Sequence, residues 1–520
     1  MSTSAKEKVK KARGFERMCL AIERVGHKIP DPTTIFLILT AIIFIVSLFI
    51  EGKVLLVPGT GEEVTLHSLL NADFTKDFIK NIPSKFVTYT PVPYVLILLL
   101  GTSVCSETGL FEVSMKRALS KVPDSLVVLI LIALSINGSL VGDGAYAFLP
   151  ALGGIIYHSK GKNPLLGIVT VYACIAAGFS ACMLITNGDV QVAGLTAEAA
   201  GLLHLDTSNI TGASTYYWQA ISAIFLIPVA WFASEKIVSP ILKSTEYALD
   251  DDADNSRTAE DLTALTPDQQ KGLRYAGISA ILVILFVLIG AVPSHGFLRN
   301  QETGSLLIGS PFMSDLVMLI VALFFIPGLT YGIASKAIRS DKDLTRMISR
   351  GFSSMSPFLV MCFGASIFNT CFSYTNVASA IAIGGANLME SIHLTGLFLV
   401  LFIVLLCALC NLFMPHTTAK WILLAPVMVP MCALLGFSPN FTTALYKIGN
   451  SVTNCITPLS SGMVIALGEM QKYRKKTSLG SIISLNIPFS VMFLIFWTLM
   501  TIVFYLVGLP VGPNAPIFMS

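Results

Sequence analysis

The sequence repeats one small polar pattern, Gly, any residue, Ser, four residues, Ile, Thr, in two distant places. The copies read GFSACMLIT at 178–186 and GNSVTNCIT at 449–457. Hydroxyl, amide and free main-chain carbonyl oxygens in such a stretch are the ligands that hard cations prefer, and they also suit a polar solute. The candidate ligands in and beside the copies are Ser180, Thr186, Asn187, Ser451, Asn454 and Thr457.

Two aspartates, Asp143 and Asp189, lie in strongly apolar surroundings. A carboxylate in such a place is costly unless it is paired, protonated or solvated along an ion pathway, so either residue is a candidate for ion coupling. Either can instead hold an unwound stretch of backbone. Two buried aspartates that share a proton are also what an aspartyl protease uses, although no supporting motif surrounds this pair.

A second group of polar side chains suits an anionic, aromatic solute. Lys447 and Asn450 are one helical turn apart and face the same way, and a lysine attracts anions. Thr418 and Trp421 combine a hydroxyl with an indole, which suits an aromatic ligand that forms hydrogen bonds. The plainer alternatives are a lysine whose ammonium reaches the membrane surface and a tryptophan that packs a turn.

Asn137 and Asn411 each stand at the start of a turn that contains Gly or Pro. An asparagine in that position either ligates a cation or supplies ordinary turn chemistry, and the sequence leaves both readings open. The histidines and cysteines show no zinc-type spacing, so no transition-metal site is expected and a sodium site is the metal site to consider.

The composition places all these residues in a membrane protein. Of the 520 residues, 54% are apolar and 12% are charged, and the mean hydropathy is +0.74. These values lie far outside the usage of soluble domains. The net charge of +3 is small and scattered, which argues against a nucleic-acid partner. The ten cysteines lack the spacing of a disulfide scaffold, and no motif indicates a cofactor.

A helix needs about 17 to 25 apolar residues to cross a bilayer. Seven segments meet this requirement: 33–50, 92–104 with its flanks, 218–238, 273–292, 313–334, 352–372 and 479–507. Two regions, 125–200 and 394–467, instead alternate apolar stretches of roughly 12 to 16 residues with polar breaks, and each stretch is too short to cross alone. We therefore expect each region to contain one re-entrant hairpin and one interrupted crossing helix.

The distribution of Lys and Arg predicts the orientation. Basic residues gather before residue 33 and in the loops 236–274, 336–350 and 472–476, which places these segments in the cytoplasm. The tail after Val507 carries no charge and is expected outside. About nine crossings, seven ordinary and two interrupted, also put the two termini on opposite sides. The two hairpins then enter from opposite faces of the membrane.

The predicted fold is an all-α polytopic membrane protein with inverted repeats. Its expected segments are a cytoplasmic N-terminal segment (1–32), scaffold helices 1 and 2 (33–124), a first repeat with hairpin 1 and a broken helix (125–243), a cytoplasmic linker (244–272), scaffold helices with the start of the second repeat (273–393), hairpin 2 with its broken helix (394–471), and a last helix with an external C-terminus (472–520).

Broken helices indicate the kind of function. Irregular backbone at mid-membrane depth is tolerated only where protein or a water-filled cavity satisfies it. Opposed units of this kind form the solute site of many secondary transporters, with half-helix N-termini facing anions and unwound carbonyls facing cations. The sequence therefore favours an ion-coupled transporter that works by alternating access, with sodium or a proton as the coupling ion. An intramembrane aspartyl protease and a passive channel are the alternatives.

The order of several motifs resembles the AbgT family of p-aminobenzoyl-glutamate transporters. These motifs span nearly the whole chain and include ERVGHKIPDP, GDGAYAFLPALGGIIY, GKNPLLGI, GLTAEAA, LTYGIASKAIR, AKWILLAPVMVPM and LVGLPVGP. The resemblance implies a homodimer in the bacterial inner membrane, in contact with lipid, with nine transmembrane helices and two opposed hairpins. It also implies small-molecule solutes, because the family is associated with uptake of p-aminobenzoyl-glutamate and with efflux of sulfonamides.

The resemblance further implies roles for individual residues. The family's functional aspartate after the first break falls on Asp189, its hairpin-tip hydroxyl on Thr418 and its tryptophan on Trp421. A proline in its second break corresponds to Pro458.

The chain departs from the family pattern in two places. The family commonly has an arginine and, three positions later, an aspartate where this chain has Lys447 and Asn450, which puts a proton relay there in doubt. Cys182 stands where a related sequence would have an asparagine. Both changes can alter the coupling ion or the solute.

Overall fold

The computed structural model describes residues 30–56, 63–120, 122–123, 126–142, 144–243, 247–250, 263–307 and 309–519. Asp143 and the segment before residue 30 lie outside these residues. The described elements are almost all helices, as expected for apolar segments that must satisfy their own backbone groups. A short antiparallel pair of strands, β1 Val54–Leu56 and β2 Glu63–Thr65, follows the first helix.

The helices fall into three sets along the chain. In the parts outside the two broken regions they are α3 Pro32–Ile50, α4 Ala72–Val87, α5 Pro91–Glu107, α6 Leu110–Ser120, α14 Pro267–Ala291, α15 Pro311–Ser314, α16 Leu316–Ala334, α17 Asp341–Ser354, α18 Ser356–Tyr374 and α19 Val377–Ser391. The first repeat contains α7 Val127–Ile136, η1 Asn137–Leu140, α8 Gly144–Ser159, α9 Pro164–Ala177, α10 Asn187–Gly201 and the continuous run α11 Tyr216–Phe232, η2 Ala233–Val238 and α12 Ser239–Leu242. The second contains α20 Gly396–Phe413, α21 Thr417–Leu434, α22 Pro439–Val452, α23 Ser461–Gln471 and α24 Leu479–Val507.

Both predicted helix breaks are present. Break 1, residues 178–186, separates α9 from α10, and break 2, residues 453–460, separates α22 from α23. The first polar pattern fills break 1, whereas the second pattern starts inside α22 and only its last five residues lie in break 2. The two patterns are therefore offset by about one helical turn relative to their breaks.

The two broken helices begin in the same way. Asn163 caps α9 by accepting a hydrogen bond from the N–H of Leu165 at 3.0 Å, and Pro164 is the first helical residue. Ser438 caps α22 by accepting one from the N–H of Phe441 at 3.1 Å, and Pro439 is the first helical residue. A polar cap followed by proline is a strong helix start, so the sequences GKNP and GFSP fix equivalent starts in the two repeats.

Nine helical segments within the described residues are long and apolar enough to cross a membrane. Seven of them match the predicted ordinary spans. The other two are the arms of the second hairpin, α20 and α21, with 18 residues each, so the prediction that every piece of this region is too short to cross alone is wrong. The arm α21 is longer than predicted because it begins at Thr417, inside the expected turn, and continues through Pro426 and Pro430.

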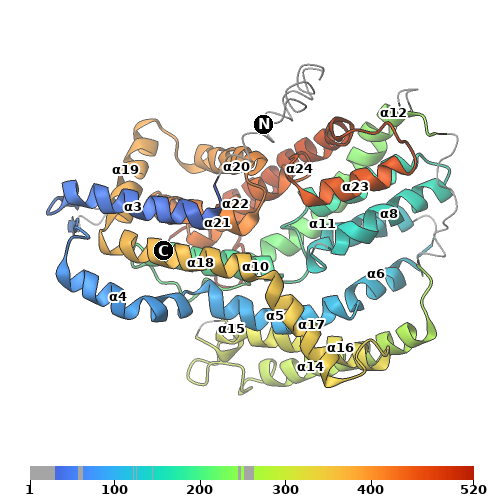
Figure 1. Cartoon of the computed structure of the whole chain (residues 1–520), viewed down its shortest axis with the longest axis horizontal. Helices are drawn as coiled ribbons and strands as arrows, with labels where there is room; N and C mark the ends of the chain where they lie inside the picture. The colour runs from blue at the N-terminus through green and yellow to red at the C-terminus, as the bar shows by residue number, and fades with distance from the viewer. Residues whose placement is uncertain are drawn as a thin grey trace.

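The repeats pack against each other in a reciprocal way. Within each repeat the second hairpin arm packs on the first half of the broken helix, α8 on α9 and α21 on α22. Between the repeats, α10 packs on α21 and α23 packs on α8. In Figure 1, α20 and α21 lie in the left half of the molecule and α8 lies in the right half, so the hairpins approach the centre from opposite ends.

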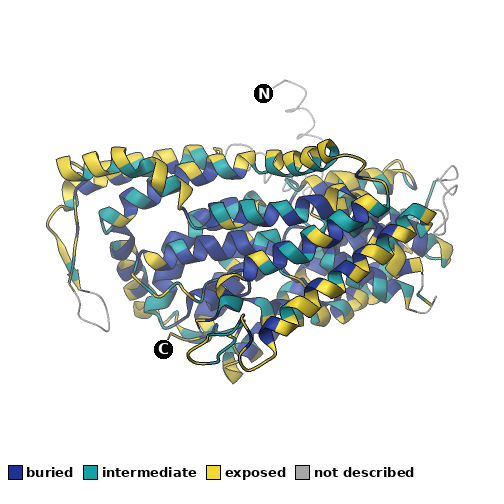
Figure 2. Ribbon diagram, turned by 90° about the horizontal axis from the view of Figure 1, so that it is seen from below, coloured by how far each residue is buried: buried dark blue, intermediate teal, exposed yellow. Residues whose placement is uncertain are grey.

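The broken helices occupy the centre of the molecule. All 14 residues of α9 and all 14 residues of α22 are buried. Outer helices such as α3 and α14 instead expose long apolar faces, which are drawn in yellow where they are visible in Figure 2. Exposed apolar faces on the outside and a buried, partly polar centre are the pattern of a bundle surrounded by lipid.

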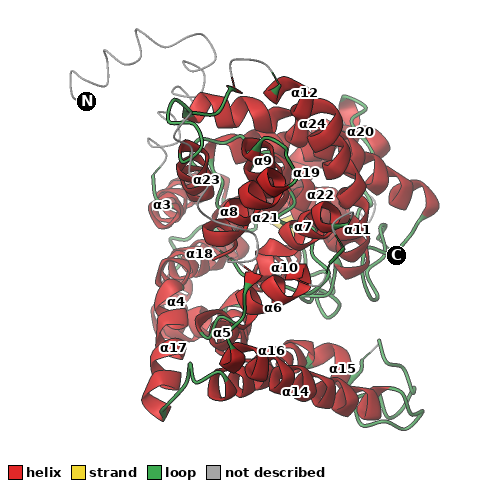
Figure 3. Cartoon of the chain, turned by 90° about the vertical axis from the view of Figure 1, so that its right-hand side faces the viewer, coloured by secondary structure: helices red, strands yellow, loops and turns green. Residues whose placement is uncertain are grey.

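A second apolar core lies beside the central bundle. It joins α5, α6, α14 and α16, with Leu98, Val321 and Phe324 among its buried residues. In Figure 3, α14, α15 and α16 form a separate layer at the bottom of the view, and α5 lies between this layer and α10. Because α5 also packs on α10, it connects the outer layer to the central site.

Candidate functional site

The two polar patterns meet at equivalent residues. Ser180 and Ser451, the serines of the two copies, have their hydroxyl oxygens 2.8 Å apart although they are 271 residues apart in the chain. The main-chain N–H of Ser180 also donates to Ser451 Oγ at 3.2 Å. The two repeats therefore contact each other at matching positions, which is the arrangement expected near an approximate two-fold axis.

An ion pair between Asp189 and Lys447 lies beside this contact. Lys447 Nζ is 2.6 Å from Asp189 Oδ1, and the two side chains are 4% and 5% exposed. The same ammonium donates to Thr215 Oγ1 at 2.7 Å and to Gln219 Oε1 at 3.3 Å. The three protons of an ammonium therefore all have acceptors here.

The second carboxylate oxygen of Asp189 is also fully used. Asp189 Oδ2 accepts hydrogen bonds from the N–H of Thr186 at 2.7 Å, from its hydroxyl at 2.8 Å and from the Gln219 amide at 3.1 Å. Thr186 and Asp189 form a capping box at the start of α10, where the helix dipole favours a negative charge. Complete hydrogen bonding on both sides is the condition under which a buried ion pair is tolerated.

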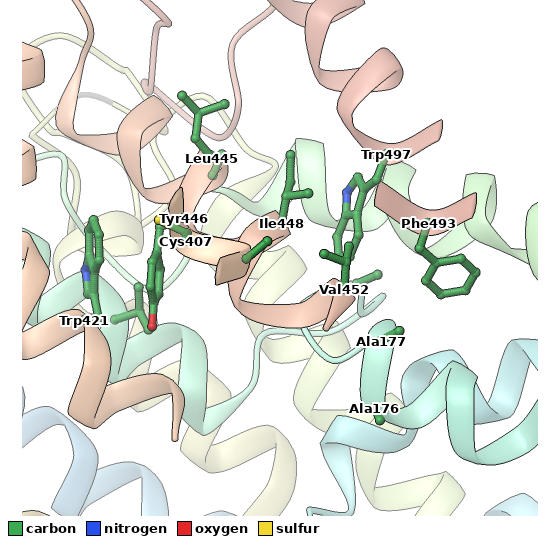
Figure 4. Close-up of a cluster of buried hydrophobic side chains, with 14 of the residues drawn as sticks. Ala176, Ala177, Cys407, Trp421, Leu445, Tyr446, Ile448, Val452, Phe493 and Trp497 are labelled. Atoms are coloured by element: carbon green, nitrogen blue, oxygen red, sulfur yellow. The ribbon is translucent and has the colours of Figure 1, made fainter. Parts of the chain in front are cut away.

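An aromatic pair joins α21 to α22, and its member on α22, Tyr446, directly precedes Lys447 in the chain. The rings of Trp421 and Tyr446 stack with their centroids 4.1 Å apart, and they lie side by side in Figure 4. The Trp421 indole N–H donates to Thr196 Oγ1 at 3.0 Å, and this hydroxyl is 2.8 Å from that of Thr443. Trp421 is completely buried. It thus joins α21 to both α10 and α22.

The tip of the second hairpin rests on the same helices. Asn450 Nδ2 donates to Thr417 Oγ1 at 3.0 Å, and the Tyr446 hydroxyl donates to the Thr417 carbonyl at 2.5 Å. Thr418 Oγ1 donates to Gln191 Oε1 at 2.5 Å. The hairpin tip is therefore held by α22 through Asn450 and by α10 through Thr418.

Each predicted tip asparagine binds the break of its own repeat. Asn411 Nδ2 donates to Thr453 Oγ1 at 2.9 Å and to Asn454 Oδ1 at 2.8 Å in break 2. Asn137 Oδ1 accepts from the N–H of Met183 at 2.7 Å in break 1. Thr457 Oγ1 adds a bond of 2.8 Å to a main-chain carbonyl near the end of α20. In both repeats the hairpin tip is thus tied to the unwound backbone.

Among the described residues, two predicted site residues, Asn187 and Pro458, take no part in these contacts. The side-chain oxygen of Asn187 is buried and has no hydrogen-bond partner among the described residues. Pro458 lies half-buried in break 2. Asp143 is outside the described residues, and the ion-pair partner of Asp189 is Lys447.

Several polar residues that contact the predicted site residues are not among those predicted from the sequence. Glu198, in α10, accepts hydrogen bonds from the N–H of Thr90 at 2.8 Å and from its hydroxyl at 2.5 Å. Charged and amide side chains are rare in apolar helices, so their presence in the sequence already marks them as candidate site residues. The missed residues are Gln191, Thr196, Glu198, Thr215, Gln219 and Lys420.

A cavity of about 1210 Å³ lies on the other side of α10. Its walls include Tyr89 and Thr90 before α5, Asn369 on α18, and a face of α10 that contains Gly194 and Glu198. Asp189, Lys447 and Trp421 do not line it. The helix α10 therefore separates this cavity from the ion pair.

Within the described part of the chain, no group of three or more His, Cys, Asp or Glu side chains is placed to hold a metal ion. The oxygen atoms around breaks 1 and 2 are hydroxyls, amides, carbonyls and one carboxylate. This donor set suits an alkali cation or a proton, together with a polar solute.

Comparison with known proteins gives consistent relatives. The model of the AbgT putative transporter family matches residues 17–519. The p-aminobenzoyl-glutamate transport protein of Escherichia coli (strain K12) is 30% identical over 495 residues, which cover 95% of each chain.

Two solved structures share the fold over almost their whole length. MtrF of Neisseria gonorrhoeae, which represents a class of antimetabolite efflux pumps, is 30% identical with a TM-score of 0.89, covering 96% of this chain and all of that one. The YdaH transporter of Alcanivorax borkumensis is 28% identical with a TM-score of 0.86, covering 93% of this chain and all of that one. The chain is therefore a multi-pass membrane transporter, not an enzyme, and it belongs to the AbgT family.

Proposed function

We propose that the protein is an ion-coupled secondary active transporter of the inner membrane. Its solutes are small anionic aromatic molecules such as p-aminobenzoyl-glutamate, the compound named for its Escherichia coli relative, or sulfonamide-type antimetabolites, in line with the efflux class of MtrF. It works as a homodimer by alternating access, and its coupling ion is sodium or a proton. The observation that carries this proposal is the buried, fully hydrogen-bonded pair of Asp189 and Lys447 between the two breaks.

The pair offers a direct way to couple a solute to a cation. A solute carboxylate that binds the Lys447 ammonium takes it away from Asp189. The Asp189 carboxylate is then a buried charge without its partner, which is costly in the membrane interior. A sodium ion or a proton at Asp189 removes this cost, so anion and cation bind best together.

The surroundings of the pair match an aromatic anion. Lys447 supplies the positive charge, Tyr446 directly precedes it on α22, and the Trp421 ring of α21 stacks on the Tyr446 ring. Hydroxyls and amides of Thr417, Thr418 and Asn450 offer further hydrogen bonds when the hairpin tip moves. In the present structure these groups bind one another, so a solute must replace existing contacts at the tip.

The cavity beside α10 provides a route to the site. Its walls come from the outer helices α4, α5 and α18 on one side and from α10 on the other. With the predicted orientation, the start of α4 and the end of α10 face the external side. Movement of α10 against the outer helices then opens or closes a path between this cavity and the ion pair.

The test is solute flux in proteoliposomes that contain the purified protein. Labelled p-aminobenzoyl-glutamate and a labelled sulfonamide are offered under separate sodium and proton gradients. We expect saturable flux of at least one solute against its own gradient, driven by one of the two ions, and no flux once that ion gradient is collapsed. Flux that only equalises concentrations would indicate a passive channel. If neither solute moves under either gradient, the substrate assignment is wrong.

A further inference from the structure

A second buried lysine, Lys420, lies at the tip of hairpin 2 and has no role in the proposal above. It is 2% exposed and belongs to the first turn of α21. In the part of the chain that the structure describes, no carboxylate forms an ion pair with it. Its ammonium instead donates to Asn411 Oδ1 and to the Met414 carbonyl, the latter at 3.4 Å, and lies 5.7 Å from the centre of the Tyr446 ring.

The groups around the Lys420 side-chain nitrogen suit a positive charge. The two oxygens and the negative face of the aromatic ring are all acceptors, so each of the three ammonium protons has a partner. A neutral amine would need a donor for its lone pair, and the Tyr446 hydroxyl already donates to the Thr417 carbonyl. The first turn of a helix otherwise disfavours a cation, which makes a lysine at this position costly without such partners.

The ammonium also fixes the connection between the hairpin and break 2. Because Asn411 Oδ1 points to Lys420, its Nδ2 points to Thr453 and Asn454 and ties the tip to the unwound backbone. In transporters with discontinuous helices, unwound backbone carbonyls and half-helix C-terminal ends coordinate the coupling cation, and the Lys420 ammonium lies beside such an unwound stretch.

The residue of the first repeat that aligns with Lys420 carries no charge. Counting back from the matching prolines, Pro426 and Pro150, the residue that corresponds to Lys420 is Gly144. The tip asparagine of that repeat, Asn137, uses its side-chain oxygen to accept from the N–H of Met183. The cation-like contact is therefore a feature of the second repeat.

We propose that Lys420 is a covalently attached cation that fills an oxygen-lined cation site between hairpin 2 and break 2. This half of the protein then needs no bound metal ion to hold the hairpin tip in place. One consequence of this inference is that the coupling ion acts at Asp189 and not at this hairpin tip. Only this consequence rests on the proposed ion coupling.

The experiment compares thermal unfolding of the purified full-length protein in sodium chloride, in N-methylglucamine chloride and in methylammonium chloride. Lys420→Ala leaves space for a small cation. In N-methylglucamine chloride we expect its Tm to be lower than that of the wild type. In sodium chloride or methylammonium chloride we expect its Tm to rise by about 2 °C or more, beyond any rise that the wild type shows. Lys420→Met fills the space without a charge, so its Tm should fall without this recovery. Lys116→Met, which alters a surface ion pair with Glu112, is the matched control and should respond as the wild type does.

Two results would overturn the inference. One is a Lys420→Met variant with the Tm and solute flux of the wild type, since the charge would then be dispensable. The other is a Lys420→Ala variant whose Tm responds to sodium and methylammonium no more than that of the wild type. If the alanine variant does not fold, the methionine variant and flux through it still decide the question. Because unfolding needs no solute, a failure here is distinguishable from a wrong substrate assignment.

Discussion

Among single residues, Lys447 tells most about the central site. It stands on the fully buried helix α22, yet its ammonium reaches an aspartate on α10 and a hydroxyl and an amide on either side of the start of α11. A lysine that served only to reach the membrane surface would point its charge toward water. This one instead neutralises the carboxylate that caps α10.

Removing one member of this pair should destabilise the protein. In Lys447→Met the Asp189 carboxylate stays buried without its cation, and we expect a loss of about 3 to 5 kcal/mol in the free energy of unfolding. Asp189→Asn should be similarly harmful, because it leaves the ammonium unpaired. Thermal or denaturant unfolding of the two purified variants measures both losses.

The double variant Asp189→Asn with Lys447→Met separates stability from transport. It removes both charges, so it should recover much of the stability lost in the single variants while flux of p-aminobenzoyl-glutamate stays absent. A double-mutant cycle with strictly additive losses would show that the two residues are not coupled. Flux at the wild-type level in the double variant would remove the pair from the transport mechanism.

Asn450 provides a second test at this scale. In Asn450→Asp the new carboxylate can no longer donate to Thr417, and the site then holds two carboxylates and one lysine. A second buried carboxylate without a cation is tolerated when it binds a proton. We therefore expect flux through this variant to be highest at low pH and to fall as pH rises, more steeply than in the wild type. Identical pH profiles of flux for the variant and the wild type would contradict this.

At the scale of elements, one arm of each hairpin approaches its broken helix at a glycine of that helix. A Cβ added to Gly167 on α9 would lie 2.0 Å from the carbonyl oxygen of Gly153 on α8. One added to Gly449 on α22 would lie 2.5 Å from Cys407 Cβ on α20. Small residues at such contacts let helix backbones come close, which is how helices associate in lipid.

The variant Gly167→Ala should therefore separate α8 from α9. The clash is with main-chain atoms, which cannot rotate away, and we expect a cost of at least about 2 kcal/mol in stability, together with reduced flux. Gly468→Ala is the matched control, because this exposed helical glycine on α23 has open space around it. Alanine there should be neutral or stabilising by about 0.5 to 1 kcal/mol. Equal melting temperatures for the two variants would show that the contact is not tight.

The sequence predicts the two breaks well because their determinants are local. Gly178 and the caps Asn163 and Ser438 act on the few residues next to them, and the breaks fall where the apolar periodicity stops. The helices α4 and α17 were not predicted, since both have polar surfaces and neither is a clean apolar span. Their positions depend on packing against α5 and α18, which no local pattern records.

The partners of the site residues were less predictable than the residues themselves. The sequence predicts both Asp189 and Lys447 as site residues, but nothing in it pairs two residues that are 258 positions apart. Gln219 and Thr215, which complete the pair, lie outside the broken regions. Glu198 and Lys420 do carry a signal in the sequence, because charged residues are rare in apolar helices.

The whole molecule places one shared site between two opposed repeats. The serines at 180 and 451 touch, each hairpin tip binds its own break, and the second half of each broken helix packs on the other hairpin. The equivalent positions nevertheless differ in charge, with Asp189 following break 1 and Lys447 preceding break 2. The two repeats therefore share the geometry of their contacts but not their charges at the site.

The orientation in the membrane decides which side the cavity beside α10 serves. The basic loops predict that the connection between α14 and α16 is external and that α17 is cytoplasmic. Thr303 in that connection and Lys342 on α17 are both exposed, so a cysteine at either place can react with a maleimide. Eight of the nine described native cysteines are buried and the ninth, Cys410, is partly buried, so they give little background.

With an impermeant maleimide on intact cells, Thr303→Cys should be labelled and Lys342→Cys should be labelled only after the membrane is permeabilised. The unsubstituted protein gives the background of both measurements. This result would place the start of α4 and the end of α10 on the outside, since α3 and the α9–α10 unit each cross from the cytoplasm in the predicted topology. The cavity of about 1210 Å³ would then open toward the external solution, and solute would reach the ion pair from that side by movement of α10. The reverse labelling pattern would make the same cavity a cytoplasmic entrance and would contradict the orientation predicted from the basic loops.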